Sequence, residues 1–354
     1  MKIAAFTMTY NEPIFLPIWI AYYGREFGEE NLFIIDHGSD DGSTEDIGNA
    51  HRIVISRDEL DEGRRAKYVI LFHEALLQEY DAVVFSDTDE YLIADPRKFG
   101  SLKEFIQERC TSFSQAIGLE VLHILDKEAR IDVSRPILAQ RSFVRFNTLY
   151  CKPLITRVPL IWGAGFHSCD LPSTIDPDLF LFHLKRMDRD IALARLAQTR
   201  SISWSKNARK RKHSYQNRFS DDVMLQELSP FRADNVGALL IDGFDFTSDC
   251  ARYPKFAPFE GAIAAIPEAF RDAIPGVSGF GDGRPAASIA RDLSTEPGGR
   301  QNDAGIPRLL AELARLDHRG VRHAGSVGTA LAQAWNRIKR SGSYRLRKLR
   351  SRFG

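Results

Sequence analysis

The chain has 354 residues, of which 44% are hydrophobic and 27% are charged, and its formal net charge at pH 7 is +1. This composition is typical of a globular protein with one large domain or two smaller ones, and the near-zero charge argues against a general nucleic-acid binder. The cysteines are far apart and form no CxxC pair, which excludes a zinc ribbon or a thioredoxin-like site and favours reduced thiols in the cytoplasm.

The first part of the chain alternates short apolar runs with segments of helical periodicity. The order strand, helix, strand, strand, helix, strand indicates an α/β fold with a doubly wound, mostly parallel sheet. The predicted strands are residues 3–8, 31–35, 52–55 and 83–86, and the predicted helices are residues 14–28 and 61–80.

Two aspartates one residue apart, Asp87 and Asp89, follow the fourth predicted strand. Open α/β sheets bind ligands at the carboxyl ends of their strands. Carboxylate oxygens suit a hard cation such as Mg²⁺ or Mn²⁺, which would neutralise a diphosphate. An isolated pair of this kind is more often a solvated acidic turn, because turns favour Asp. Here, however, a buried strand precedes the pair, which favours a metal site.

The second part of the chain is predicted to add a helix, a strand, an irregular segment, a strand, a helix and a basic stretch that is an exposed helix or a loop. These are residues 101–108, 116–122, 138–166, 178–184, 187–199 and 205–218, respectively. From about Gly243 the composition shifts, and residues 276–299 are rich in Gly, Pro, Ala and Ser. We therefore expect an α/β domain over residues 1–235, an irregular linker over 236–305 and a basic helical segment over 306–354.

Residues 337–352 carry eight lysines and arginines and no acid. Three interpretations are open: contact with anionic phospholipid headgroups, binding of nucleic acid, or a solubilising tail. The interleaved apolar side chains favour a membrane surface. No run of about 18 apolar residues occurs, so no transmembrane helix is predicted. We expect a cytoplasmic protein whose C-terminus contacts the inner face of the membrane.

Three segments, residues 11–23, Asp36–Ser43 and Asp87–Leu92, resemble family 2-like glycosyltransferases, in the branch whose members begin with a segment of the type NEAPYLLEWIAYH. The similarity covers residues 1–125 well and 140–190 more loosely. Each motif is short, but the three in this order and spacing are specific. The resemblance implies a GT-A fold, a nucleotide-sugar donor (a UDP-sugar first) and a divalent metal cofactor, Mn²⁺ or Mg²⁺.

The resemblance also implies roles for single residues. Asp89 matches the direct metal ligand, and Asp87 would contact the ribose or donor sugar or reach the metal through water, with N-capping as its alternative. Asp36 matches the aspartate that reads the base or ribose, with an Asx-turn as its alternative, and His37 stands where the family usually has Asn or Asp. Further candidates for nucleotide-sugar binding are Thr9, Asn11, Glu12, Asp41, Arg65, Lys67 and Lys185.

Two histidines, His167 and His183, are candidates for a further metal ligand. For the catalytic base, Glu120 interrupts an apolar strand, which is costly for an acid unless it is paired, and Asp170 lies close to His167. Asp126 is a third option. Both an inverting and a retaining outcome are compatible with these residues.

The leading hypothesis is a metal-dependent glycosyltransferase that transfers a sugar to a glycan or lipid-linked hydroxyl, as in polysaccharide biosynthesis. A nucleotidyltransferase is the alternative enzyme, because it also combines a doubly wound sheet with acidic metal ligands. Such an enzyme normally has a Gly-rich, basic phosphate loop after its first strand, where this chain has Thr9–Glu12. The non-enzymatic alternative is a degenerate module that binds a sugar nucleotide without turnover, and the intact aspartate pair argues against it.

Overall fold

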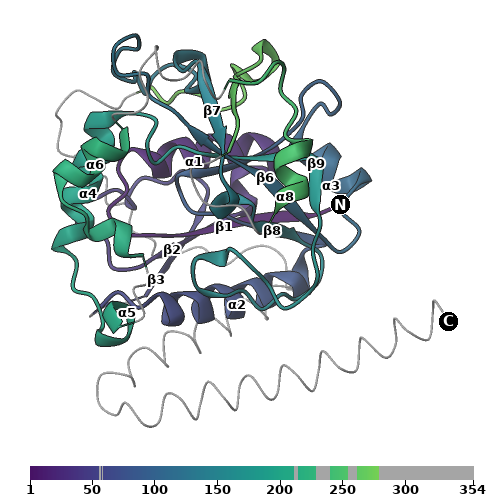
Figure 1. Cartoon of the computed structure of the whole chain (residues 1–354). Coiled ribbons are helices and arrows are strands. Elements are labelled where there is room, and N and C mark those ends of the chain that lie inside the picture. Colours follow the sequence, from purple (N-terminus) through teal and green to yellow (C-terminus); the bar gives the residue numbers. More distant parts are fainter. Residues whose placement is uncertain (56, 58, 211–213, 229–239, 254–260, 279–354) are drawn as a thin grey trace. The chain divides into compact units, whose positions relative to one another are not determined.

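The structure is a computed structural model, and it describes residues 1–55, 57, 59–210, 214–228, 240–253 and 261–278. Apart from Val54 and Ile55, the described residues belong to one compact unit, which Figure 1 colours along the sequence. Within the described ranges, no helix has both the length and the apolar character needed to cross a membrane.

Three parallel strands form the core of the sheet. β1 pairs in parallel with β2 on one side and with β4 on the other, so that Thr9 is opposite Asp36 and Phe6 is opposite Phe85. Helices α1 and α2 cover opposite faces of these strands (Figure 1), which explains why the strands are buried and apolar. The predicted parallel α/β core is confirmed. Its elements are β1 (Ile3–Thr9), α1 (Phe15–Phe27), β2 (Leu32–Asp36), the edge strand β3 (His51–Val54), α2 (Glu62–Glu79) and β4 (Ala82–Phe85).

The second half of the sheet is largely antiparallel. β8 pairs with β4, β6 pairs with β8 and β7, and β10 pairs with β7, all antiparallel, whereas β9 runs parallel to β6 and antiparallel to β5. The segment expected to be irregular, residues 138–166, therefore contains two sheet strands. The strands are β5 (Glu90–Ala94), β6 (Phe113–Val121), β7 (Phe143–Phe146), β8 (Pro153–Thr156), β9 (Ile175–His183) and β10 (Ile263–Ala265).

Further helices connect these strands. The α-helices are α3 (Leu102–Glu108), α4 (Arg189–Ser201), α5 (Lys206–Lys210), α6 (Asp221–Leu228) and α8 (Thr247–Arg252). The 3-10 helices are η1 (Glu29–Asn31), η2 (Leu138–Gln140), η3 (Thr148–Tyr150), η4 (Ala164–Phe166), η5 (Tyr215–Arg218) and η6 (Glu268–Phe270).

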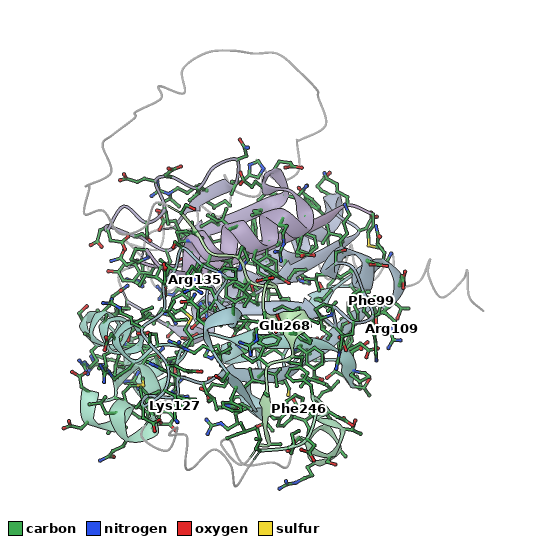
Figure 2. All side chains as sticks on the ribbon, turned by 90° about the horizontal axis from the view of Figure 1, so that it is seen from above. Phe99, Arg109, Lys127, Arg135, Phe246 and Glu268 are labelled. Atoms are coloured by element: carbon green, nitrogen blue, oxygen red, sulfur yellow. The ribbon has the colours of Figure 1, made fainter. Side chains whose placement is uncertain are left out.

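Part of the predicted linker packs on the sheet. Phe244 and Phe270 lie with their ring centroids 5.2 Å and 5.5 Å from Phe180 of β9, and Phe246, labelled in Figure 2, lies 5.2 Å from Phe244. The sheet therefore continues past the domain boundary predicted at residue 235, because β10 belongs to it. The predicted basic segment, residues 306–354, lies outside the described residues.

Candidate functional site

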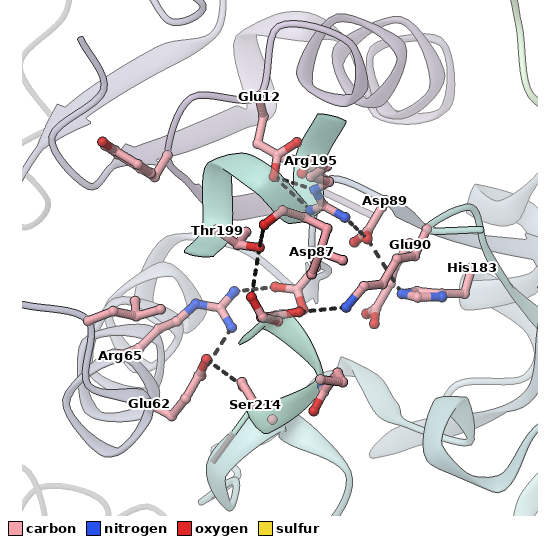
Figure 3. Close-up of a pocket in the computed structure, with 18 of the residues that line it drawn as sticks. Glu12, Glu62, Arg65, Asp87, Asp89, Glu90, His183, Arg195, Thr199 and Ser214 are labelled. Carbon is pink, nitrogen blue, oxygen red and sulfur yellow. Dashed lines mark hydrogen bonds and ion pairs between the residues drawn. The ribbon is translucent and has the colours of Figure 1, made fainter. Parts of the chain in front are cut away.

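A cavity of about 540 Å³ opens at the carboxyl ends of β1 and β4. Its walls come from the loops that follow these two strands, from the end of β9, from α4 and from the η5 segment (Figure 3). Among the described lining residues, the acids equal the lysines and arginines in number. The acids are Glu12, Glu62, Asp87, Asp89, Glu90 and Glu227, and the basic residues are Arg57, Arg65, Lys152, Lys185, Arg186 and Arg195.

Aromatic side chains of α1 hold the turn after β4 in place. The Trp19 indole donates a hydrogen bond of 2.8 Å to the Ser86 hydroxyl, and the Tyr23 hydroxyl donates one of 3.3 Å to the carbonyl of Glu90. Within the turn, the Glu90 amide donates to the carbonyl of Asp87 at 3.0 Å. Because the backbone is fixed in this way, the carboxylates of the turn lie against the cavity.

Asp89 is 4% exposed and stays ionised. Burial alone would raise its pKa, but Arg195 and then His183 lower the pKa well below the usual range of an aspartate. Its Oδ2 atom accepts a hydrogen bond from Nη1 of Arg195 and lies 3.5 Å from Nε2 of His183.

Asp87 shares its cationic partners with a neighbouring acid. Its carboxylate pairs with Arg65 and lies 3.8 Å from the Lys152 ammonium, which is also 2.5 Å from Glu90. Burial raises the pKa of Glu90 to about 7 against the opposing effect of Lys152. The pKa of Asp87 stays below its ordinary value, because Arg65 and Lys152 outweigh the effect of burial.

His183 has the protonation state that metal binding requires. Its ring lies 3.9 Å from that of Tyr150, and burial lowers its pKa to about 3, so the imidazole is neutral at pH 7. Its Nδ1 is buried and has no hydrogen-bond partner among the described residues.

The pair of Asp89 and His183 fits the predicted divalent ion. Their separation of 3.5 Å is too long for a good hydrogen bond. It is near the spacing of about 3 Å between two adjacent ligands on one octahedral ion. Within the described part of the chain, no group of three or more His, Cys, Asp or Glu residues could hold a metal. Mg²⁺, however, usually takes one or two protein carboxylates together with substrate phosphates and water.

The cavity contains several, but not all, of the predicted residues. Thr9, Glu12, Arg65, His167 and Lys185 line it along with the acidic turn and His183. Lys185 donates a hydrogen bond of 2.6 Å to Asn217, and burial lowers its pKa to about 8. His167 bonds the carbonyl of Leu149 through Nδ1 at 2.6 Å, whereas His183 lies beside Asp89. The geometry therefore favours His183 over His167 as a metal ligand.

Asn11, Asp36 and Asp41, all predicted to bind the nucleotide sugar, lie outside the cavity lining. Asp36 is fully buried, and Arg52, Thr44 and the Ser39 amide donate hydrogen bonds of 2.6–3.0 Å to its carboxylate. Both carboxylate oxygens of Asp36 thus accept hydrogen bonds from other residues of the chain. Asn11 exchanges hydrogen bonds with Asp40, and Asp41 accepts one from the Ser43 amide within its own loop.

Three other candidates also lie outside it. Lys67 is exposed on α2. Glu120 is fully buried between Arg145 and Arg186, each 2.5 Å away, and these pairs lower its pKa to about 2 despite its burial. Asp170 is exposed and accepts a hydrogen bond of 2.8 Å from the Ile161 amide. The structure thus brings neither Glu120 nor Asp170 to the cavity as a base.

Sequence reasoning missed Arg195, which donates three hydrogen bonds to two acids of the site, Glu12 and Asp89. It lies on the face of α4 that also carries the buried residues Ile191, Ala192 and Leu196. An arginine three and four residues from buried apolar positions indicates that an anionic partner lies nearby, because a helix rarely buries a cation without one. Lys152 was missed for a different reason, since it directly precedes the unpredicted strand β8.

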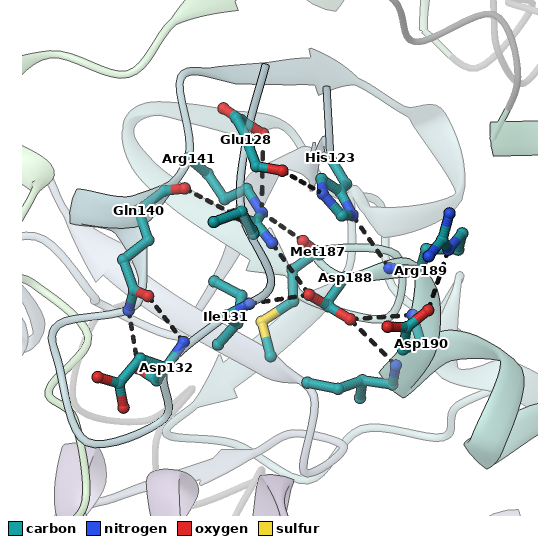
Figure 4. Close-up of polar contacts among 12 residues, drawn as sticks. His123, Glu128, Ile131, Asp132, Gln140, Arg141, Met187, Asp188, Arg189 and Asp190 are labelled. Atoms are coloured by element: carbon teal, nitrogen blue, oxygen red, sulfur yellow. Dashed lines mark hydrogen bonds and ion pairs between the residues drawn. The ribbon is translucent and has the colours of Figure 1, made fainter. Parts of the chain in front are cut away.

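A buried polar network fixes where α4 begins and hence where Arg195 lies (Figure 4). Asp188 caps the helix by accepting hydrogen bonds from the amides of Asp190 and Ile191. Its other oxygen accepts from the Ile131 amide at 2.9 Å and from Arg141 at 3.3 Å. Arg141 is only 1% exposed, so the network is part of the core.

The fold and the cavity define an α/β protein whose candidate site is an acidic turn at the carboxyl edge of the sheet. No protein-family model matches the chain, and no curated protein matches it.

Two solved structures are similar to the chain at a low level. One is mannose-1-phosphate geranyltransferase from Thermus thermophilus, with 9% identity over 65% of each chain and a TM-score of 0.25. The other is CMP:2-keto-3-deoxy-manno-octonic acid synthetase complexed with CTP, with 12% identity over 65% of this chain and 87% of that one, and a TM-score of 0.26. The chain thus spans slightly less than two thirds of the length of the first structure. At TM-scores this low, neither structure supports a conclusion about the function of this chain.

Proposed function

We propose that the chain is a metal-dependent glycosyltransferase of GT-A fold. It moves a sugar from a nucleotide-sugar donor, a UDP-sugar first, to a hydroxyl of a glycan or lipid-linked acceptor. The observation that carries this proposal is the pair of Asp89 and His183, 3.5 Å apart at the edge of a cavity that Asp87 also lines. The first and third sequence motifs support it, since the loops after β1 and β4 meet at this cavity.

Breaking the bond between a sugar and a diphosphate leaves charge on the departing diphosphate. Asp89 and His183 would hold the divalent ion, which supplies positive charge to that leaving group. Lys185 lies beside this pair and supplies a fixed cation from the chain itself. Cations that are already oriented in a largely buried cavity stabilise developing charge far better than cations in water.

The nucleoside would lie at the ends of β1 and β2. Tyr10, His37 and Arg57 line the cavity there, with the Arg57 guanidinium 3.4 Å from the centroid of the Tyr10 ring. Burial lowers the pKa of His37 to about 3, so it offers one donor and one acceptor at neutral pH. Asp36 would then support this region by holding its loop, through Ser39 and Thr44.

Replacing Asp89 with Asn tests the proposal, because the change keeps the size of the side chain and removes its charge. We expect turnover of the UDP-sugar with Mn²⁺ to fall at least about a hundredfold, by comparison with the loss of other groups that stabilise a transition state. Asp46, an exposed aspartate outside the cavity, provides the matched control Asp46→Asn, which should keep parental turnover. A folded Asp89→Asn variant with parental, metal-dependent turnover would contradict the proposal.

The same assay separates the nucleotidyltransferase alternative. A glycosyltransferase releases a nucleoside diphosphate or monophosphate from a nucleotide sugar. A nucleotidyltransferase joins a sugar phosphate to a nucleoside triphosphate and releases pyrophosphate from the triphosphate. A thermal-shift screen of UDP-, GDP- and dTDP-sugars with and without Mn²⁺ selects the donor first, because a ligand that binds only the folded state raises the melting temperature by mass action.

A further inference from the structure

Arg195 binds two acids of the cavity at once. Its Nε and Nη2 atoms donate to Oε1 of Glu12 at 2.8 Å and 2.6 Å, and its Nη1 atom donates to Oδ2 of Asp89. The guanidinium also lies 4.9 Å from the centroid of the Phe15 ring. Figure 3 shows it between the two carboxylates. One side chain of α4 thus ties the loop after β1 to the turn after β4.

The contact with Asp89 uses the oxygen that a metal ion would need. Oδ2 is the atom that faces Nε2 of His183 at 3.5 Å, and it is also the atom that accepts from Arg195. A cation bound between Asp89 and His183 would lie next to the guanidinium, and two cations at that distance repel each other strongly in a largely buried site. The hydrogen bond from Arg195 and the divalent ion therefore compete for one oxygen.

The geometry allows Arg195 to release Asp89 without leaving the site. Only Nη1 contacts Asp89, whereas the other two nitrogens remain on Glu12. A released Nη1 needs an anionic partner, because burying a cation without one is costly. The phosphates of a nucleotide would provide such a partner on the same side of the cavity as Lys185, whose charge is felt by both Asp89 and Arg195.

We propose that Arg195 is a phosphate-binding residue that occupies Asp89 while the cavity is empty and moves onto the donor's diphosphate when the nucleotide binds. This inference rests on the proposed function. The consequence is that metal binding and nucleotide binding are coupled. The nucleotide draws the Arg195 guanidinium away from Asp89, where it competes with the metal, so the divalent ion and the nucleotide strengthen each other's binding. Because such coupling is reciprocal, either ligand can be titrated to measure it.

Isothermal titration with Mn²⁺ alone, UDP alone and each in the presence of the other tests this coupling. In the parent protein, we expect UDP to tighten Mn²⁺ binding at least about tenfold, which is about 1.4 kcal/mol of coupling. In Arg195→Gln, Mn²⁺ alone should bind at least tenfold tighter than to the parent, and the coupling with UDP should shrink to the part that comes from direct attraction between metal and diphosphate. Arg200 on the same helix pairs with Asp221 and does not line the cavity, so Arg200→Gln should behave like the parent.

Arg195→Lys provides a second variant in case Arg195→Gln does not fold, since it keeps a cation but lacks the planar fork that spans Glu12 and Asp89. We expect its affinity for Mn²⁺ alone to lie between those of the parent and Arg195→Gln. If UDP tightens Mn²⁺ binding in the parent but both folded variants bind Mn²⁺ alone as weakly as the parent, the inference about Arg195 is overturned by itself. If Mn²⁺ binds none of the proteins even with UDP, the metal site of the proposed function fails as well.

Discussion

Neighbouring acids of the candidate site have pKa values that are shifted in opposite directions. The pKa of Asp89 falls because Arg195 and His183 outweigh its desolvation, whereas burial raises the pKa values of Glu12 and Glu90 to about 7. The site therefore combines two ionised carboxylates, Asp87 and Asp89, with two others that take up a proton near neutral pH. Such separation is typical of functional sites.

A buried acid remote from the cavity lining gives a prediction about pH and stability. Glu74 in α2 is 9% exposed, its Oε2 has no hydrogen-bond partner among the described residues, and burial raises its pKa from 4.5 to about 7. Because the folded-state pKa exceeds the unfolded one, the folded state holds this proton more tightly. That contribution to stability is fully present below pH 4.5 and is lost as the pH rises through about 7.

We expect Glu74→Gln to raise the free energy of unfolding at pH 8 by about 1 kcal/mol relative to its effect at pH 4.5, a value discounted for the partial exposure of the side chain. Urea denaturation at the two pH values measures the difference. Glu79, exposed on the same helix, provides the control Glu79→Gln, for which the two values should agree. A Glu74→Gln effect that is independent of pH would show that the carboxylate is not desolvated.

At the scale of elements, α4 depends on the cap that Asp188 provides. The Asp188 carboxylate serves the helix amides, the Ile131 amide and the buried Arg141 at the same time. Asp188→Ala should lower the free energy of unfolding by about 3 kcal/mol or more, because it removes the cap and a charge partner of a buried arginine. Ser101, which caps α3 through the Glu104 amide, offers a simple cap for comparison.

Chemical denaturation of Asp188→Ala and Ser101→Ala checks this prediction. Ser101→Ala should lose about 1 kcal/mol, as expected for a helix cap alone. If Asp188→Ala lowers the free energy of unfolding no more than Ser101→Ala does, the pairing of Asp188 with Arg141 contributes nothing beyond the cap. The position of Arg195 would then not depend on the network.

Local patterns predicted the elements that carry their own periodicity. The helices expected at residues 14–28 and 61–80 occur at Phe15–Phe27 and Glu62–Glu79, and the strand expected at 178–184 occurs at Ile175–His183. The strands β5, β7, β8 and β10 were missed. They have three to five residues each, and their pairing partners lie far along the chain, as in the pair of Val83 and Thr156.

The same distinction between local and distant information applies to the site. Asp87 and Asp89 could be predicted because a buried strand directly precedes them. Their partners could not, because Lys152 lies 62 residues beyond Glu90 and Arg195 lies 106 residues beyond Asp89. Glu120 was correctly identified as an acid within a strand, but its two arginines, not a substrate, compensate its charge.

At the scale of the whole molecule, the strongly basic segment 337–352 lies outside the described residues, and its membrane role stays a prediction from sequence. A chain that ends at residue 336 should no longer co-sediment with anionic liposomes, because each cation near such a surface contributes about 1 kcal/mol. Its melting temperature and its turnover with a soluble acceptor should match those of the full chain.

Three conditions in the sedimentation assay separate the interpretations of this segment. Electrostatic binding should weaken as salt shortens the screening length, and it should be absent with zwitterionic liposomes. Binding of the full chain to RNA but not to liposomes would favour the nucleic-acid interpretation, and binding to neither would favour a solubilising tail. Equal sedimentation of the full and the shortened chain with anionic liposomes would mean that residues 337–352 do not bind the membrane. Another surface of the protein would then have to contact a lipid-linked acceptor.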